Sequence, residues 1–365
     1  MSNTPEIAVE VIDLCKSYGD VVAVDSINLA IESGQYFVLL GPSGGGKTTL
    51  LRLLGGFVKP TRGRVLLHGV DVAHLPPNRR PTSMVFQGYA LFPHMSVVRN
   101  VAYGLKLRRL APDEIESRVG EMLELVGLAG LNDRMPHELS GGQQQRVQLA
   151  RALVLETDVL LLDEPLAALD AKLRKDMCLE LKRIQEKVGI TFLHVTHNQE
   201  EAMTIADRIA VIAGGELMEE ATPREIYERP VRRFTAGFIG ENNLLAGRVT
   251  HRTNDILSID LGFASVDLKS GDDVTPGVEV SLSIRSELMR LLQPGERVDG
   301  RLQSIPATYV ETIYLGLTTS HLVKLPTGQE ISVRHISSDN GALRFEPEQE
   351  VAIGWELEQA RLHTS

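Results

Sequence analysis

One glycine-rich segment has the residue types and the spacing that phosphate binding requires. It fits the pattern G-x-x-x-x-G-K-[ST], with Thr49 next in the chain, and its residues are Gly41, Pro42, Ser43, Gly44, Gly45, Gly46, Lys47 and Thr48. Backbone N–H groups can converge on a phosphate only where side chains do not intrude, so the clustered glycines predict a phosphate cradle. The Lys47 ammonium could then reach the β- and γ-phosphates of a nucleotide, and the Thr48 hydroxyl could ligate Mg²⁺.

The segments on either side of this cradle decide between a nucleotide site and a glycine turn with a chance lysine. Residues 36–40 are apolar and predict a buried strand, and residues 49–54 predict a helix that begins near Lys47. The positive end of that helix dipole would face the phosphates. The strand–loop–helix order therefore favours the nucleotide site.

A second apolar segment ends in two carboxylates. Residues 158–163 read as a central strand of a parallel sheet, where ligands bind beyond the carboxyl ends of the strands. Asp163 is placed to hold Mg²⁺, and Glu164 could deprotonate an attacking water. The alternative is that Asp163, Glu164 and Pro165 only end the strand in a turn.

A third segment, residues 139–146, opens a helix with glycines and no acidic residue, which suits it to face an anion. A phosphate cradle at one place and an anion-facing helix start at another predict a site divided between two protomers. One copy would supply the cradle and the other the closing face. ATP binding would then drive a closure that produces force, as in a motor subunit.

Together these segments resemble the ATP-binding-cassette family over roughly the first 240 residues. The resemblance implies that Tyr18 stacks on adenine and that Gln87 touches Mg²⁺ and water. It further implies that His197 contacts the γ-phosphate and that Asp170 is the D-loop aspartate. The family signature, which binds the γ-phosphate held by the opposite protomer, corresponds to Ser140, Gly141, Gly142 and Gln143.

Each match alone has a structural alternative, because a tyrosine, a glutamine or a strand-ending histidine is common in cores and caps. His194, on the predicted strand 191–196, is read as such a structural residue. The order and spacing of all the matches favour the family. Two positions depart from it: Gly45, expected only to add flexibility, and Ala167, where relatives commonly have serine.

Composition restricts which partners and which cell compartment are expected. The chain has 365 residues, a net charge of −10 and only two cysteines, Cys15 and Cys178. The acidic balance disfavours a nucleic-acid partner, and two distant cysteines favour a reducing compartment. The first residues show no secretory signal and no apolar run approaches a membrane span. We therefore expect a peripheral protein at the cytoplasmic face of the inner membrane, attached through a partner.

The expected fold is an α/β P-loop ATPase core followed by an all-β domain. Residues 1–240 would form the cassette, with an N-terminal antiparallel β subdomain and a helical insertion over about 88–150. Residues just after Gln87, including Tyr89 and Phe92, would contact a membrane subunit if they are exposed. Part of this segment is equally suited to the core.

Residues 241–365 contain many short predicted strands separated by turns, which points to a small β-barrel. Residues 278–284 alternate as a half-buried strand does, residues 325–331 read as a turn entering a strand, and residues 351–357 read as another strand. This tail resembles the OB-like accessory domain of importer ATPases, whose I-R-P-E motif is approximated with Ser286 in place of proline. A dimerising or structural barrel is as compatible with this sequence as a ligand-sensing one.

The resemblance implies an ATPase that energises a bacterial-type importer as a pair of copies beneath membrane permease subunits, with a solute-binding protein acting upstream. Residues 238–245 most resemble polyamine importers, for spermidine or putrescine. Importers of sugar, iron(III) or another small solute are the alternatives. A non-transport cassette fits less well because the chain has one cassette, and an ATP-binding module without turnover fits less well because the chain retains Glu164 and His197. An exporter fits less well because exporters usually have fused membrane spans or lack a barrel tail of this kind.

Overall fold

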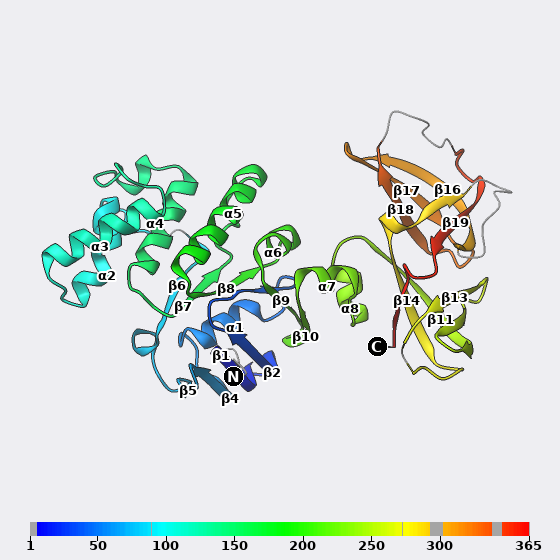
Figure 1. Ribbon diagram of the computed structural model, residues 1–365, viewed down its shortest axis with the longest axis horizontal. Helices are drawn as coiled ribbons and strands as arrows, with labels where there is room; N and C mark the ends of the chain where they lie inside the picture. Colours follow the sequence, from blue (N-terminus) through cyan, green and yellow to red (C-terminus); the bar gives the residue numbers. More distant parts are fainter. Residues whose placement is uncertain (1–5, 89, 272, 293–301, 338–344, 365) are drawn as a thin grey trace, which may run out of the picture. The chain divides into compact units, whose positions relative to one another are not determined.

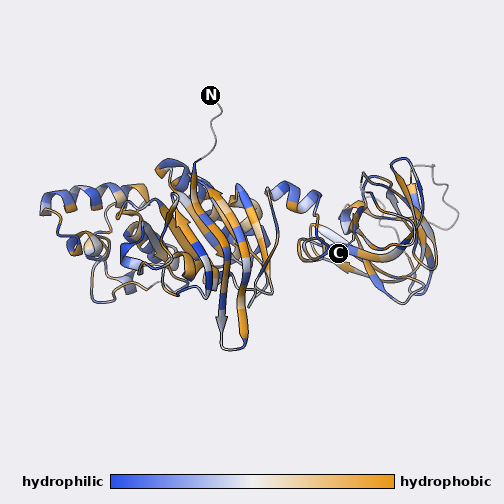
Figure 2. Cartoon of the chain, turned by 90° about the horizontal axis from the view of Figure 1, so that it is seen from below, coloured by the Kyte–Doolittle hydropathy of each residue, from blue (hydrophilic) through white to orange (hydrophobic). Residues whose placement is uncertain are grey.

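The computed structural model describes residues 6–88, 90–271, 273–292, 302–337 and 345–364. Tyr89 and the first five residues, on which two of the expectations above depend, lie outside these ranges. The chain divides into two compact units, residues 1–223 and 224–365 (Figure 1). Figure 2 shows the hydrophobic residues concentrated along the strands of each unit.

The first unit alternates strands and helices. Its strands are β1 (Ile7–Tyr18), β2 (Val21–Glu32), β3 (Tyr36–Leu40), β4 (Arg62–Leu67), β5 (Val70–Asp71), β6 (Thr82–Val85), β7 (Val159–Asp163), β8 (Thr191–Thr196), β9 (Arg208–Ala213) and β10 (Glu216–Ala221). Its helices are α1 (Lys47–Leu54), α2 (Val97–Leu107), α3 (Pro112–Leu125), α4 (Gly141–Leu153), α5 (Ala171–Val188) and α6 (Gln199–Ile205).

The second unit is dominated by strands. Two helices, α7 (Pro223–Glu228) and α8 (Arg233–Phe238), precede them. The strands are β11 (Asn242–Thr253), β12 (Ile256–Asp260), β13 (Ser265–Lys269), β14 (Glu279–Arg285), β15 (Arg290–Leu292), β16 (Leu302–Tyr314), β17 (Thr318–Lys324), β18 (Glu330–Ile336), β19 (Glu350–Glu356) and β20 (Arg361–His363).

A six-stranded sheet in the order β10-β9-β3-β8-β7-β6 forms the centre of the first unit. Strands β6, β7, β8, β3 and β9 run parallel, and β10 pairs antiparallel with β9 at the edge. All residues of β3, β7 and β8 are buried, as the apolar sequences of β3 and β7 predict, and β8 buries three polar residues, Thr191, His194 and Thr196, as well. The carboxyl ends of β3, β7 and β8 therefore meet at one edge of the sheet, where the predicted site residues follow them.

The N-terminal strands form a separate antiparallel sheet in the order β2-β1-β4-β5, which confirms the predicted antiparallel subdomain. Its inward residues share one hydrophobic cluster with α1 and the central sheet. The helical insertion is formed by α2, α3 and α4, grouped together in Figure 1. Within α3, Val119 and Leu123 are buried.

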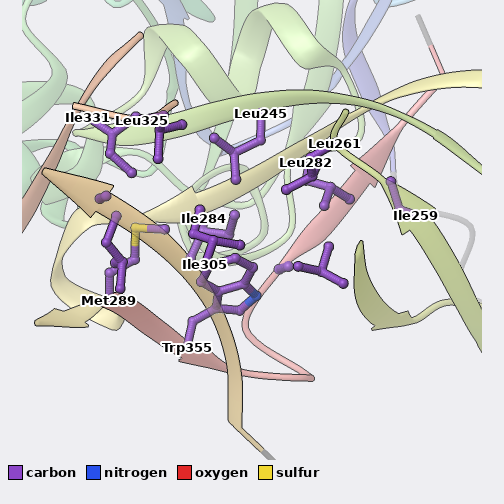
Figure 3. Close-up of a cluster of buried hydrophobic side chains, with 14 of the residues drawn as sticks. Leu245, Ile259, Leu261, Leu282, Ile284, Met289, Ile305, Leu325, Ile331 and Trp355 are labelled. Atoms are coloured by element: carbon purple, nitrogen blue, oxygen red, sulfur yellow. The ribbon is translucent and has the colours of Figure 1, made fainter. Parts of the chain in front are cut away.

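The second unit contains two five-stranded sheets, β13-β12-β11-β14-β20 and β15-β19-β16-β17-β18. Every pairing within them is antiparallel. Both sheets contribute to one hydrophobic core, where Trp355 packs near Ile284, Ile305 and Met289 (Figure 3). The turn between β17 and β18 and the strand β19 lie where the sequence predicted them. The all-β fold class of this unit is confirmed.

The predicted half-burial of β14 is wrong, because Val280 to Arg285 are all buried. The alternation of apolar and polar residues suggested that one face meets water. Instead, the polar residues are buried with hydrogen-bond partners: Ser283 Oγ lies 2.8 Å from His363 Nε2. The Arg285 guanidinium donates to the carbonyl oxygens of Ile239 and Tyr227.

These bonds also place α7 and α8 with the second unit, so the contact boundary after residue 223 precedes the sequence-based boundary at residue 240. The motif that approximates I-R-P-E ends in the short 3-10 helix Ser286–Leu288. There the backbone N–H of Ser286 donates to the Glu241 carbonyl at 3.2 Å. A proline has no N–H and could not form this bond.

Candidate functional site

The glycine-rich loop connects β3 to α1 and passes very close to neighbouring backbone. A Cβ atom at Gly41 would lie 1.9 Å from the Ile212 carbonyl oxygen, and one at Gly46 would lie 2.4 Å from the Ala23 carbonyl oxygen. Gly44 and Gly46 have φ angles of 77° and 101°, in the left-handed region that favours glycine. The glycines therefore let the loop fold tightly against β2 and β9.

Gly45 is constrained by its surroundings, contrary to the expectation that it only adds flexibility. Its N–H donates to the Pro42 carbonyl at 3.1 Å, and its carbonyl accepts from Gly215 N–H at 3.0 Å. A Cβ atom at this position would lie 2.9 Å from the Ile212 carbonyl oxygen. A larger residue would need a shift of the loop relative to β9.

Lys47 begins α1 and is 4% exposed. Its ammonium donates to the carbonyl oxygens of Gly41 and Pro42, each at 2.8 Å, so it lies across the loop. Burial lowers the pKa of Lys47, while Glu164 and Asp163 act in the opposite direction. The lysine is thus a cation beside the two carboxylates that end β7.

Thr48 and Asp163, two of the three residues that the sequence analysis assigned to Mg²⁺, lie in contact with each other. Thr48 Oγ1 donates to Asp163 Oδ1 at 3.0 Å, across the gap between α1 and the end of β7. Burial raises the pKa of Asp163, and the hydrogen bond from Thr48 opposes that shift. Carboxylate and hydroxyl oxygens are the hard donors that Mg²⁺ prefers, so this pair fits the cation.

Glu164 is held in an unusual backbone conformation at the point where β7 ends. Its φ angle is 44°, which side-chain-bearing residues rarely adopt, and its N–H donates to the Val195 carbonyl at 3.0 Å. Its Oε2 atom accepts from Gln87 Nε2 at 3.2 Å and lies 3.2 Å from His197 Nδ1. The structure therefore joins Gln87, Glu164 and His197, which are far apart in the sequence.

The loop that carries His197 is fixed by buried neighbours, which the sequence reasoning missed. Glu201, 5% exposed, accepts from Thr196 Oγ1 at 2.7 Å. Thr196 Oγ1 in turn accepts from Asn198 N–H at 3.0 Å. The Arg174 guanidinium lies 3.5 Å from Glu201 and also donates to the Leu169 carbonyl at 2.8 Å. An acidic residue in the first turn of α6 was the available signal, but surface acids often occupy such positions.

Burial keeps His194 neutral, in line with its structural interpretation. It is fully buried, its Nδ1 lies 3.0 Å from the Tyr36 hydroxyl, and burial lowers its pKa to about 3.

The signature residues form the N-terminus of α4. Ser140 caps the helix: its Oγ accepts from Gln143 N–H at 3.3 Å, and Gln143 Oε1 accepts from Ser140 N–H at 2.9 Å. No acidic residue occupies the first turn. The amides of Gly141 and Gly142 belong to the first helical turn, whose N–H groups have no partner within the helix.

Two further predicted residues lie at element ends. Asp170 caps α5, accepting from Leu173 N–H at 3.0 Å. Tyr18 ends β1 and is 49% exposed, with Lys16 Nζ 4.8 Å from the ring centroid. The hairpin of β1 and β2 that carries Tyr18 also supplies the Ala23 carbonyl beside the cradle.

A phosphate loop between β3 and α1, two carboxylates at the end of the parallel strand β7, and the glycine-rich start of α4 together identify the site as that of an ATP-binding-cassette ATPase. Residues 24–167 match the ABC transporter family, and residues 282–362 match the TOBE domain. None of the helices in the described ranges is long and apolar enough to cross a membrane.

Relatives in curated collections match almost the whole chain. The spermidine/putrescine import ATP-binding protein PotA of Roseobacter denitrificans is 46% identical, covering 99% of this chain and 99% of that protein. The protein of the same name from Acidothermus cellulolyticus is 47% identical over 97% of this chain and 93% of that protein. The chain belongs to this family of ABC importer ATP-binding subunits and is an ATPase.

Solved structures support the cassette fold. The cbiO1 protein of Clostridium perfringens, part of an ABC transporter complex, is 32% identical with a TM-score of 0.58. It covers 60% of this chain and 90% of its own. A dimeric cassette in a post-hydrolysis state, bound to ADP and Pi, is also 32% identical, with a TM-score of 0.53 over 59% of this chain and 99% of its own.

Proposed function

We propose that two copies of this chain hydrolyse ATP at the cytoplasmic face of the membrane to drive polyamine import through permease subunits. The geometry of Glu164 carries the proposal. Its carboxylate lies between Gln87 and His197, directly after the Asp163 that pairs with Thr48. A base, a polar residue that orients water and a phosphate cradle are the parts that hydrolysis of a phosphoanhydride requires.

Glu164 would accept the proton of the attacking water at its carboxylate, while the Gln87 side chain orients that water. His197 would donate a hydrogen bond to the γ-phosphate and hold Glu164 in place from the other side. Lys47 would exchange its carbonyl partners for the β- and γ-phosphates. Ser43 and Thr49 would extend the cradle on either side, and Tyr18 would stack on the adenine.

Thr48, Asp163 and Gln87 would hold Mg²⁺, each through an oxygen atom. When bound, the cation neutralises charge on the phosphate oxygens. The chain's own contribution is to fix these donors: Asp163 is 4% exposed at the end of a fully buried strand, so its carboxylate has little freedom to move.

The signature would close the site of the opposite copy. The first turn of α4 presents amides and no acidic side chain, and helix N-termini of this kind bind anions. Asp170, at the start of α5, would lie along the same contact between the copies. The dimeric ADP-bound neighbour supports this arrangement by its similarity.

Polyamine as the transported solute is inferred from relatives named for spermidine and putrescine import, which match nearly the full length of both chains. A solute-binding protein would deliver the polyamine to the permease. Exposed aromatic residues near Gln87 support a permease contact: Phe57 and Phe86 are both exposed, with ring centroids 5.5 Å apart. Phe92 is half-buried against Tyr103, with ring centroids 4.6 Å apart.

Uptake of radiolabelled spermidine by cells that lack this chain tests the proposal. Restoring the chain should restore uptake, and the same chain with Lys47→Ala should not. Labelled maltose and iron(III) serve as the comparison solutes. Restored uptake of one of these in place of spermidine would overturn the polyamine assignment while leaving the ATPase intact.

A further inference from the structure

Gln148 connects α4 to the segment that carries Gln87. It lies on the inner side of α4 and is 3% exposed. Its Nε2 atom donates to the Phe86 carbonyl at 3.0 Å and to the Gly88 carbonyl at 3.2 Å. One buried amide therefore holds the backbone on both sides of Gln87.

The two hydrogen bonds from Gln148, called the clamp below, hold the backbone where the β-sheet no longer fixes it. The pairing of β6 with β7 ends at Val85, so residues 86–88 lie beyond the strand. A second residue of α4 contributes further along, because the Arg151 guanidinium donates to the Ala90 carbonyl at 2.9 Å. Side chains of α4 thus take over from β-sheet pairing in positioning this segment.

Gln87 in turn contacts the proposed base. Its Nε2 atom donates to Glu164 Oε2 at 3.2 Å, and its own side chain is exposed, so its backbone determines where the amide can reach. A shift of about 1 Å in a group that orients a reactant lowers the rate substantially. The position of residues 86–88 relative to α4 therefore bears directly on hydrolysis.

We propose that Gln148 is a positioning residue for ATP hydrolysis, which fixes the backbone around Gln87 and so sets the contact of Gln87 with Glu164. This inference rests on the proposed role of Gln87. It also gives α4 two tasks, because the helix presents the signature at its N-terminus and holds the Gln87 segment two turns later. Closure of the opposite copy's nucleotide site on the signature would thereby change the position of Gln87 relative to Glu164 in this copy.

Gln148→Met in the full-length chain tests the clamp, because methionine has a similar length and no N–H donor. A matched control exists in the same unit. Gln185, 2% exposed on α5, donates through Nε2 to the Gly34 and Ile190 carbonyls at 2.6 and 3.1 Å, and has no role in the proposed chemistry. Both Met variants lose a buried two-carbonyl clamp, so both should unfold at lower temperature.

Only Gln148→Met should lower kcat for ATP, by about 10- to 100-fold, with KM and ADP affinity unchanged. Equal losses of kcat in the two Met variants, or no loss in Gln148→Met, would overturn the proposal. If Gln148→Met does not fold, Gln148→Asn retains the amide on a side chain too short to reach both carbonyls. The same fall in kcat is then expected, and an unchanged kcat contradicts the proposal.

A double-mutant cycle separates this inference from the function on which it rests. In the background of Gln87→Ala, Gln148→Met should cause no further loss of kcat, because the residue that it positions is gone. Losses that multiply would show that Gln148 acts by another route, and would overturn the inference alone. A normal kcat in Gln87→Ala itself would instead refute the role proposed for Gln87.

Discussion

Replacement of Glu164 by glutamine changes one atom at the centre of the site. The amide has nearly the same shape as the carboxylate, and the backbone constraint is unchanged, because the φ angle of 44° and the N–H bond to Val195 do not involve the side chain. The side chain has intermediate burial between Gln87 and His197. The substitution therefore removes basicity with little change in packing.

The expected fall in kcat follows from the role of Glu164 as general base. A positioned general base contributes about 10²–10⁴-fold to a rate, which corresponds to about 3–5 kcal/mol of activation free energy. The remaining contributions, from the cradle, Lys47 and the Thr48–Asp163 pair, do not depend on the carboxylate. We therefore expect kcat to fall by that factor while ATP affinity is retained and the ATP-bound dimer accumulates.

Steady-state phosphate release and equilibrium ATP binding measure the two quantities separately. Glu200→Gln is the matched control, because Glu200 is an exposed acid on α6 whose carboxylate is outside the proposed chemistry. Near-normal turnover in Glu164→Gln would refute the role of base. A parallel fall in ATP affinity would show that the carboxylate acts in binding, and would equally refute the reasoning.

Four further outcomes are expected. Ser140→Arg should abolish hydrolysis but leave ADP affinity of the single copy unchanged, and a fall in ADP affinity would place the signature in the same copy's pocket. Gly46→Ala should weaken nucleotide binding and stability far more than Gly44→Ala, because a Cβ at Gly46 would lie 2.4 Å from a backbone oxygen and a Cβ at Gly44 would meet nothing. Thermal unfolding with and without ADP compares the two variants, and equal effects would contradict the close approach. The pKa of His194 is lowered to about 3 in the folded chain, whereas the unfolded chain has the ordinary value of about 6.5. The unfolded chain therefore binds a proton first as the pH falls, and the folded chain loses stability below about pH 6.5. In His194→Gln the change in unfolding free energy between pH 7 and 5 should therefore shrink by about 2 kcal/mol, and an unchanged pH dependence would show that another group is responsible. A chain cut after Pro223 should fold and bind ATP with Mg²⁺, because each unit has its own core; an insoluble fragment would contradict the boundary.

Local sequence determined the elements that carry the site. The apolar residues of β3 and β7 are stable only when both faces of each strand are buried, so the sequence predicted a parallel sheet. The glycine spacing and the lysine at the start of α1 are properties of adjacent residues, readable without a fold. The roles of these residues remain predictions, which the experiments above address.

Tertiary structure decided what depends on residues distant in the chain. The burial of polar side chains on β14 could not be read from their alternation, because the bonds of Ser283 and Arg285 come from α7, the segment after α8, and β20. The sequence likewise did not show that Glu201 fixes the loop that carries His197, or that Gln148 holds the backbone beside Gln87. A buried polar residue is stable only with a partner, and the partner is supplied by the fold, so its function becomes visible only there.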